Sequence, residues 1–252
     1  MKKYGIIGYP LAQSASPAFF NGKFAAEGID AEYIPFEISG IEELPGILQA
    51  NPELCGFNVT IPYKQQIKKY LDAISDEAAG IDAVNVVKVT RKENGQPLLK
   101  GYNSDVTGFT RSLHPLVEGK HSKALILGTG GVSKAVAYSL QKLGIEYMFV
   151  SRKAGNGAAA YSDITQECME SHTLIINCTP LGMTGHGVDQ CPDIPYEFIG
   201  KGHLLYDVVY NPEETLFLKK GMERGAQTKS GYEMWYLQAL ASWEIWNNEE
   251  EL

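Results

Sequence analysis

Short apolar runs rich in isoleucine, valine and aromatic residues alternate with helical stretches along this chain, and this alternation limits its possible folds more than any other feature. In the N-terminal part the strand-like runs cover residues 4–8, 31–37, 56–60 and 83–89. The helical stretches between them cover residues 17–27, 41–49, 65–71 and 76–79, with Ser16 and Ser75 as candidate N-caps. The pattern predicts a mostly parallel sheet with helices on both faces and right-handed crossovers.

A second alternation begins near Asp105. Its strands are expected at residues 123–127, 147–151, 173–177 and 204–209, and its helices at residues 106–113, 132–143 and 213–223. A long final helix, residues 232–246, has apolar residues at near-helical spacing and should pack on other parts of the chain. We therefore expect an α/β protein with two domains. The N-terminal domain, residues 1–105, is completed by residues 231–252, and residues 106–230 form the second.

The composition is that of a globular protein and excludes several kinds of partner. Apolar residues make up 44% of the chain and charged residues 21%. The net charge of −8 argues against nucleic acid, because phosphate backbones are bound by clustered lysine and arginine. No apolar stretch approaches the roughly 20 residues of a membrane helix. The run at residues 4–8 is too soon interrupted by Pro10 to be a signal peptide.

The cysteines lack the spacing of a metal site, with no C-x-x-C pair and no Cys/His ligand pattern. They are Cys55, Cys168, Cys178 and Cys191. We expect reduced thiols in a cytoplasmic protein that has no metal.

Two loops each present one charged side chain directly after a strand-like run. Residues 56–64 end in Lys64, and residues 101–105 end in Asp105. A lysine and a carboxylate presented in this way suit proton transfer beside a carbonyl or an alcohol.

A glycine-rich turn, Gly128-Thr129-Gly130-Gly131, follows one predicted strand and opens a helix. Glycines let the backbone approach a pyrophosphate, and the helix N-terminus offers free N–H groups. Ser133 stands where the usual fingerprint has its third glycine, and a tight turn without a ligand is the alternative interpretation. An acid–base pair together with a dinucleotide turn indicates a hydride-transfer enzyme.

The next strand ends in Ser151-Arg152-Lys153, where an NAD enzyme would carry an acid for the ribose 2′-hydroxyl. Two cations in place of that acid favour a 2′-phosphate and therefore NADP(H). The alternative is that these are ordinary exposed basic residues.

Ser14 and Ser16 lie in a loop that opens a helix, where two hydroxyls and free helix N–H groups could hold a carboxylate. Simple N-capping is the alternative. Without the other motifs, three further residues would be interpreted as ordinary polar groups of the core or surface. They are Asn85, Tyr210 and Gln238.

Together these segments resemble the shikimate dehydrogenase family over nearly the whole chain. Those that carry the resemblance are Ser14-Ala15-Ser16-Pro17, Asn58-Val59-Thr60-Ile61-Pro62-Tyr63-Lys64, Asn103-Ser104-Asp105, Asn177-Cys178-Thr179-Pro180-Leu181-Gly182-Met183, Asp207-Val208-Val209-Tyr210-Asn211-Pro212 and residues 231–238. Each is modest evidence alone, but six in the family's order argue strongly against coincidence.

The resemblance implies an enzyme that reversibly reduces 3-dehydroshikimate to shikimate with NADP(H), in aromatic amino-acid and chorismate biosynthesis. It implies a substrate-binding N-terminal domain, to which the C-terminal helix returns, and a Rossmann-like NADP-binding domain between them. Lys64 and Asp105 would be the catalytic pair.

The resemblance also assigns residues to the two ligands. The substrate would be contacted by Ser14, Ser16 and Tyr210 at its carboxylate and by Thr60, Asn85 and Gln238 at its ring or hydroxyls. The cofactor would be held by Gly128, Thr129, Gly130, Gly131, Val132, Ser151, Arg152 and Lys153, with Val208, Gly231 and Asp76 near the nicotinamide. The partners expected are therefore small molecules, for a protein that is a monomer or a homodimer.

Several positions differ from the family's usual residues. Phe20 replaces the His before Asn21, Val86 the Thr after Asn85, and Ser104 the Thr before Asp105. Ser104 keeps a hydroxyl, whereas Val86 removes one, so we expect a hydrogen bond near Asn85 to be missing. Beside Arg152, Ser151 and Lys153 replace the family's Asn and Thr.

The segment from Arg152 to Asn177 is also shorter than is usual in the family. Residues 154–157, Ala-Gly-Asn-Gly, are poor helix formers. We expect the helix that normally follows the adenosine-phosphate loop to be shortened or absent, which bears on adenosine affinity and on the choice of NADP over NAD.

Two alternatives remain open. One is a quinate/shikimate dehydrogenase, or a related cyclitol dehydrogenase, with relaxed cofactor choice. The other is a catalytically silent relative that binds dinucleotide or shikimate as a sensor, although such a protein should have lost Lys64 or Asp105 and this chain keeps both.

Overall fold

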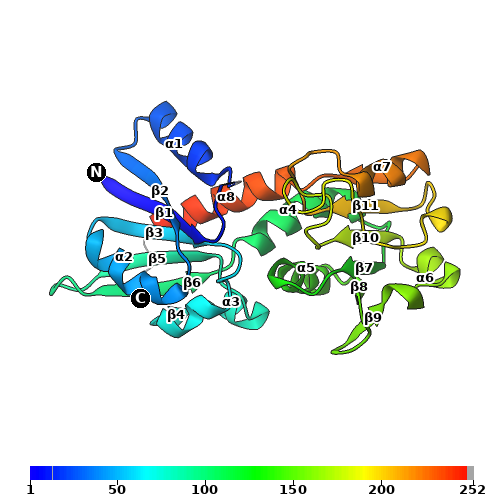
Figure 1. Ribbon diagram of the computed structural model, residues 1–252, viewed down its shortest axis with the longest axis horizontal. Coiled ribbons are helices and arrows are strands. Elements are labelled where there is room, and N and C mark those ends of the chain that lie inside the picture. The colour runs from blue at the N-terminus through cyan, green and yellow to red at the C-terminus, as the bar shows by residue number, and fades with distance from the viewer. Residues whose placement is uncertain (13, 249–252) are drawn as a thin grey trace. The chain divides into compact units, whose positions relative to one another are not determined.

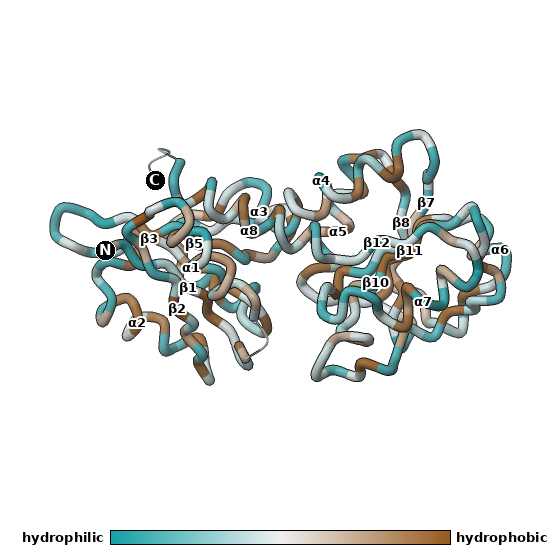
Figure 2. Tube along the Cα trace, turned by 90° about the horizontal axis from the view of Figure 1, so that it is seen from above, coloured by the Kyte–Doolittle hydropathy of each residue, from teal (hydrophilic) through white to brown (hydrophobic). Residues whose placement is uncertain are grey.

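The computed structural model describes residues 1–12 and 14–248, and the chain divides into two compact units (Figure 1). The first consists of residues 1–104 together with the chain from Ala239 onward, and the second of residues 105–238. Each unit is built around one six-stranded sheet. Figure 2 shows apolar stretches along the strands inside each unit and polar residues along many outer loops.

The sheet of the first unit is mostly parallel, with strand order β2-β1-β3-β5-β6-β4. Its strands are β1 (Lys2–Gly8), β2 (Ala31–Glu37), β3 (Leu54–Val59), β4 (Ala73–Ile74), β5 (Val86–Arg91) and β6 (Pro97–Tyr102). Among these strands only β5 is reversed, because it pairs antiparallel with both β3 and β6 while the remaining pairs are parallel. The predicted mostly parallel sheet is confirmed.

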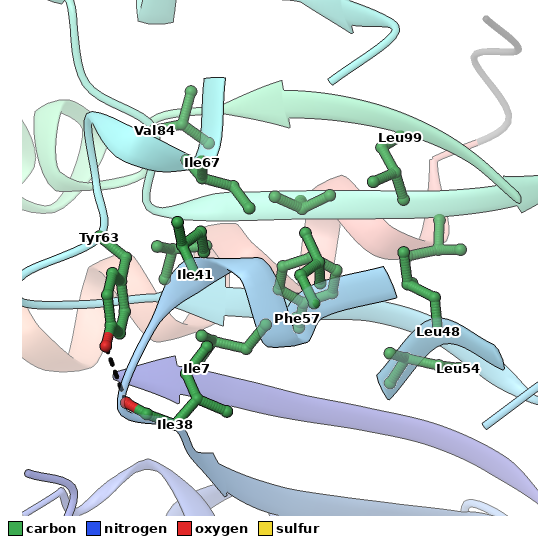
Figure 3. Close-up of a cluster of buried hydrophobic side chains, with 14 of the residues drawn as sticks. Ile7, Ile38, Ile41, Leu48, Leu54, Phe57, Tyr63, Ile67, Val84 and Leu99 are labelled. Atoms are coloured by element: carbon green, nitrogen blue, oxygen red, sulfur yellow. Dashed lines mark hydrogen bonds between the residues drawn. The ribbon is translucent and has the colours of Figure 1, made fainter. Parts of the chain in front are cut away.

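Helices cover both faces of this sheet. They are α1 (Ser16–Glu27), η1 (Ile41–Glu43), α2 (Leu44–Ala50), η2 (Gln66–Tyr70), α3 (Asp76–Ile81) and the part of α8 (Tyr232–Asn247) from Ala239 onward. Side chains alternate along β1. Ile7 packs in a core with α2, η2 and α3, whereas Tyr4 and Ile6 pack with α1 and α8. Figure 3 shows the first of these cores, with Phe57 of β3 near its centre.

One predicted N-cap is confirmed and the other is wrong. Ser75 caps α3, since its side chain accepts a hydrogen bond from the Ala78 backbone N–H at 3.2 Å. The N-cap of α1 is Ala15, and Ser16 is the first helical residue. Ser16 therefore lies one residue past the cap position.

The pattern missed the hairpin formed by β5 and β6. The two strands are joined by a turn in which Lys92 N–H donates to the Gln96 carbonyl at 3.0 Å and Gly95 N–H to the Lys92 carbonyl at 2.8 Å. The sequence indicated a strand-like run before the 101–105 loop but not the bounds of β6, because Lys100 and Gly101 interrupt its apolar residues. Residues 65–71, predicted as a helix, contain the 3-10 helix η2 instead of an α-helix.

The second unit contains an entirely parallel sheet, with strand order β12-β11-β10-β7-β8-β9. Its strands are β7 (Lys123–Leu127), β8 (Glu146–Ser151), β9 (Ala158–Ala160), β10 (Leu174–Asn177), β11 (Leu204–Asp207) and β12 (Gln227–Lys229). The chain runs from β7 to β8 and β9 on one side, then resumes at β10 and continues to β11 and β12 on the other. This is a doubly wound, Rossmann-like sheet, and sheets of this kind usually bind ligands at the carboxyl ends of the strands where the strand order reverses, here between β7 and β10.

Helices cover both faces of this sheet as well. They are α4 (Asp105–Val117), α5 (Gly131–Lys142), η3 (Tyr161–Asp163), α6 (Gln166–Ser171), η4 (Tyr196–Phe198), α7 (Leu216–Glu223) and α8 as far as Gln238. Ala124 and Ile126 of β7 pack in a core with α4 and α5, and Leu125 and Leu127 in a second core with α6 and α7. The sequence did not predict β9, α6 or β12, which are short. The helix expected at residues 213–223 begins only at Leu216.

The connection between β8 and β9 consists of residues 152–157 and contains no helix. A parallel crossover usually takes about a dozen residues or more, often as a helix. Here the chain reverses in a tight turn, in which Gly155 and Ala158 exchange N–H···O bonds of 2.9 and 3.0 Å. Gly155, Asn156 and Gly157 all have positive φ, a conformation that glycine and asparagine tolerate. The helix expected to be shortened or absent after Arg152 is absent from residues 152–157, and the next α-helix before Asn177 is the six-residue α6.

No helix among the described residues is both long and apolar enough to cross a bilayer. In residues 1–12 and 14–248, no group of three or more His, Cys, Asp or Glu side chains is arranged to hold a metal ion.

Candidate active site

The loop after β3 carries Lys64 and is anchored on both sides. Thr60 N–H donates to the Ile7 carbonyl at 2.9 Å, and the Thr60 carbonyl accepts from Tyr63 N–H at 2.9 Å. The buried Tyr63 ring places its hydroxyl 2.8 Å from the Ile38 carbonyl, to which it donates (Figure 3). The Lys64 carbonyl in turn accepts from Val84 N–H at 2.8 Å. The backbone at Lys64 is therefore held in one conformation.

Asn85 is locked to the residue that precedes Asp105. Ser104 N–H donates to Asn85 Oδ1 at 2.7 Å, and Asn85 Nδ2 donates to Ser104 Oγ at 3.1 Å. Both side chains are buried. Ser104, which replaces the family's threonine, uses its hydroxyl in this pair, and Asp105 follows directly as the first residue of α4.

The Asn85 side chain is hydrogen-bonded although Val86 offers no hydroxyl. Both polar atoms of the Asn85 side chain are bonded to Ser104. Val86 lies fully buried in the apolar core with α1 and α8, where a hydroxyl would need a partner of its own. Phe20 is equally buried there and stacks on Tyr33, with ring centroids 4.6 Å apart.

Ser14 lies two residues before α1, and Ser16 is the first residue of that helix. Ser14 N–H donates to the Leu11 carbonyl at 2.9 Å. Ser16 is 7% exposed, and its side chain hydrogen-bonds that of Tyr33. Burial raises the pKa of Tyr33 well above its ordinary value, so the hydroxyl stays protonated and can donate onward. Asp76 is exposed at the start of α3 in the first unit, so the structure places it in the other unit from the glycine turn.

The glycine turn lies at the carboxyl end of β7, at the point where the strand order of the second unit reverses. Gly128 has φ +104 and lies against the β10 loop, since a Cβ there would approach the Thr179 methyl to 3.1 Å. Gly130 differs, because its φ is −79 and a Cβ there would meet no atom within 4 Å. Apart from the two chain neighbours of Gly130, the described residues leave the space beside it open, which fits a backbone position that a phosphate-bearing ligand can approach.

Ser133, in place of the third glycine of the fingerprint, supports the turn. It is fully buried, and its hydroxyl donates to the Gly130 carbonyl at 2.7 Å. The departure from the fingerprint is therefore accommodated inside the first turn of α5.

The basic residues after β8 are exposed. The Ser151 hydroxyl donates to the Lys153 carbonyl at 2.5 Å, which folds the chain at the strand end, and the Arg152 and Lys153 side chains remain accessible. Two cations beside a Gly-rich turn suit a phosphate group.

A buried carboxylate, which the sequence analysis did not assign a role, joins the loops after β10 and β11. Asp207 accepts hydrogen bonds from Asn177 Nδ2 at 2.9 Å, Val209 N–H at 3.0 Å and Thr215 Oγ1 at 2.6 Å. The Asn177 side chain in turn accepts from the N–H and hydroxyl of Thr179 at 3.0 and 2.7 Å.

Asp207 is fully buried, and burial raises its pKa to about 7 against the effect of these three donors. An acidic residue at the end of an apolar parallel strand is the sequence signal that could have identified it, since the carboxyl ends of such strands carry ligand sites.

The segments around Tyr210 and Gly231 lie together in the second unit. Gly231 N–H donates to the Val209 carbonyl at 3.1 Å, and any Cβ at Gly231 would collide with the Val208 carbonyl oxygen. Val208 and Gly231, both predicted near the nicotinamide, are therefore adjacent. The Tyr210 ring stacks on Trp235 with centroids 5.4 Å apart.

Gln238 lies one helical turn along α8 from Trp235, and its Nε2 donates to the Trp235 carbonyl at 3.0 Å. In the second unit the structure thus brings together the glycine turn with the β10 loop, and Val208 with Gly231 and Tyr210. In the first it brings Asn85 to Ser104 and Ser16 to Tyr33.

Comparison with known proteins gives one consistent result. Residues 6–87 match the family model described as the shikimate dehydrogenase substrate binding domain. The chain is 37% identical to the shikimate dehydrogenase (NADP(+)) of Aquifex aeolicus, over 98% of this chain and 91% of that protein. It is 35% identical to the enzyme of the same name from Caldanaerobacter subterraneus, over 98% and 92%.

The solved structures agree. The fold superposes on the Aquifex aeolicus shikimate dehydrogenase with a TM-score of 0.85 at 33% identity, covering 100% of this chain and 94% of that one. It superposes on the Thermus thermophilus enzyme in complex with NADP(H) and shikimate with a TM-score of 0.82 at 28% identity, covering 98% and 94%. On sequence and on fold, the chain belongs to the shikimate dehydrogenase family.

Proposed function

We propose that this protein catalyses the reversible NADP-dependent reduction of 3-dehydroshikimate to shikimate, a step of aromatic amino-acid biosynthesis. The observation that carries the proposal is that the chain aligns over 98% of its length with shikimate dehydrogenases (NADP(+)) and keeps both Lys64 and Asp105. The relative crystallised with NADP(H) and shikimate supports the choice of both ligands.

Lys64 and Asp105 act as the acid–base pair. When bound, NADP(H) supplies the hydride that reaches the ketone carbon. The Lys64 ammonium supplies a proton or a positive charge to the oxygen that becomes negative, and Asp105 orients the lysine and accepts a hydrogen bond from a substrate hydroxyl.

The substrate is held through its carboxylate and its ring hydroxyls. Ser14, Ser16 and Tyr210 bind the carboxylate, and the stacking of Tyr210 on Trp235 supports this by fixing the direction of the ring. The ring and its hydroxyls are contacted by Thr60, Asn85 and Gln238.

Most of the residues assigned to the cofactor belong to the second unit. Its pyrophosphate meets the turn from Gly128 to Val132, which the open space beside Gly130 supports. Ser151, Arg152 and Lys153 hold the adenosine phosphate. Val208, Gly231 and Asp76 lie near the nicotinamide.

We assign the substrate to an N-terminal domain of residues 1–105 completed by residues 231–252, and the cofactor to residues 106–230. The four free cysteines are consistent with a cytoplasmic protein. A monomer or a homodimer is expected, with small molecules as the partners.

Initial rates of shikimate oxidation with NADP and with NAD, and with quinate as a second substrate, test the function. Activity confined to shikimate and NADP supports the proposal and means that Arg152 and Lys153 suffice for the phosphate. Binding of shikimate without turnover in any combination would refute the enzyme and favour a sensor.

A relaxed dehydrogenase is the second candidate, and one observation favours it. The connection after Arg152 lacks a helix, so fewer protein groups surround the adenosine end than a full crossover would provide. Relatives of similar fold have been solved with NAD, among them the quinate dehydrogenase of Corynebacterium glutamicum, with a TM-score of 0.84 at 26% identity. Comparable rates with NAD or with quinate would assign the protein to this class.

Substitution of Lys64 by alanine tests the catalytic pair. We expect kcat to fall by about 10²–10⁴-fold while KM for shikimate changes little, because proton transfer is lost and the carboxylate contacts remain. Lys68→Ala is the control, since Lys68 is four residues along and forms a surface ion pair with Asp82. Near-normal turnover in the Lys64 variant would show that Lys64 is not a catalytic residue.

A further inference from the structure

A network of hydrogen-bonded, buried polar side chains joins β2 to the C-terminal helix in the first unit. The Tyr33 hydroxyl donates to Asn58 Oδ1 at 2.7 Å, and Asn58 Nδ2 donates to Ser242 Oγ at 3.0 Å. Ser242 Oγ lies 3.2 Å from Ser104 Oγ, which accepts from Asn85 Nδ2 at 3.1 Å. None of the five is more than 7% exposed.

Ser242 is the central residue of this hydrogen-bonded network. It is 184 residues from Asn58 and 138 from Ser104 in sequence, yet its hydroxyl bonds both. A serine hydroxyl has one proton and two lone pairs, so it can accept from Asn58 and share the second bond with Ser104 in either direction. Ser242 thereby couples α8 to the ends of β3 and β6.

Asn58 and Ser104, which Ser242 bonds, each precede one member of the proposed acid–base pair in the sequence. Asn58 is the penultimate residue of β3, after which the chain reaches Thr60 and Lys64. Ser104 precedes Asp105 without an intervening residue. Displacing either side chain would therefore move the backbone that presents a reacting group, and small displacements of such groups are costly in rate.

Tyr33, at the other end of this hydrogen-bonded network, is held in place by its neighbours. Tyr33 is stacked on Phe20, and its backbone N–H and carbonyl are bonded to the side chain of Asn21 at 2.8 and 3.0 Å. Tyr33 also hydrogen-bonds Ser16, which is proposed to bind the substrate carboxylate. If Ser242 loses its hydroxyl, Asn58 Nδ2 keeps the Asn85 carbonyl, at 3.3 Å, as the weaker of its two bonds.

We propose that Ser242 is a positioning residue, whose hydroxyl sets Asn58 and Ser104 and through them the presentation of Lys64 and Asp105. This inference rests on the proposed function. A buried polar network of this kind specifies one arrangement of the elements that it joins.

Ser242→Ala tests the proposal, with Ser139→Ala as the matched control. Ser139 is also fully buried in a helix, but its hydroxyl donates to the Ala135 carbonyl of its own helix at 2.9 Å. We expect Ser242→Ala to lower kcat for shikimate oxidation by about ten-fold and to shift the pH profile of kcat/KM, with KM for NADP unchanged. Ser139→Ala should change none of these.

Tyr33→Phe removes a single oxygen from the other end and should lower kcat in the same direction by a smaller factor. Because both substitutions act on Asn58, their effects in the double variant should be less than additive. If Ser242→Ala does not fold, the kcat and pH profile of Tyr33→Phe still test the positioning role. Unchanged kcat and pH profile in Tyr33→Phe, and in Ser242→Ala where it folds, would overturn the proposal and leave a structural role.

Backbone hydrogen exchange separates this proposal from the proposed function. Faster exchange at Thr60, Tyr63 and Ser104 in Ser242→Ala, but not in Ser139→Ala, supports positioning even if the wild-type protein does not oxidise shikimate. Absence of wild-type turnover would refute the proposed function alone. Unchanged exchange at these amides would refute the role of Ser242 whatever the activity.

Discussion

Replacing Asp207 by asparagine should remove part of the pH dependence of stability. The amide oxygen of asparagine can keep the bonds from Asn177 and Val209, and its NH₂ group can donate to the Thr215 hydroxyl. A protonated Asp207 would bond in the same way. The variant therefore carries the neutral form of this side chain at every pH.

The sign follows from the direction of the pKa change. Burial raises the pKa of Asp207 from 3.8 to about 7 in the folded protein, so the folded chain keeps a proton that the unfolded chain has released. The stabilising contribution is complete below pH 3.8 and is lost as the pH rises through about 7. Between pH 5.5 and 8.5 the wild type should lose about 2 kcal/mol of unfolding free energy through this group, at about 1.4 kcal/mol per pKa unit.

Urea unfolding of both proteins at pH 5.5 and 8.5, followed by circular dichroism, measures the effect. Every other titrating group is shared, so the difference between the two pH dependences isolates Asp207. Asp193→Asn, which changes an exposed aspartate of the same unit, should behave as the wild type does. Equal pH dependence in wild type and Asp207→Asn would refute the argument that burial dominates over the three hydrogen bonds.

Two further substitutions test the structure at other points. Gly130→Ala should leave the melting temperature nearly unchanged, because a Cβ there meets no atom within 4 Å, yet raise KM for NADP several-fold, because the methyl group occupies the space proposed for the pyrophosphate. Equal KM values would place the pyrophosphate elsewhere. Trp246→Phe should lower the unfolding free energy by about 1–3 kcal/mol, measured by urea denaturation, because it leaves the buried Val87 carbonyl without the indole N–H that donates to it at 3.0 Å. No loss of stability would mean that this bond adds nothing to the docking of α8.

Local patterns predicted most of the secondary structure because period and composition are properties of short segments. β2 and β7 have the predicted bounds, and the glycine turn lies between a strand and a helix as expected. The pattern indicated a strand-like run before the 101–105 loop but not the bounds of β6, where Lys100 and Gly101 interrupt the apolar residues, and it did not predict the short β9 after the 152–157 turn. Such segments become strands because a neighbouring strand supplies hydrogen-bond partners, which composition does not record.

The sequence by itself determined the α/β class, the order of the motifs and the identities of Lys64 and Asp105 as the candidate acid–base pair. Only the tertiary structure decided the reversal of β5, the burial of Asp207 and the contacts of Ser242. The physical reason is the sequence separation over which each kind of interaction acts. Strand period and turn chemistry act between neighbouring residues, whereas the bond from Asn58 to Ser242 joins side chains 184 residues apart, which only the folded chain brings within hydrogen-bonding distance.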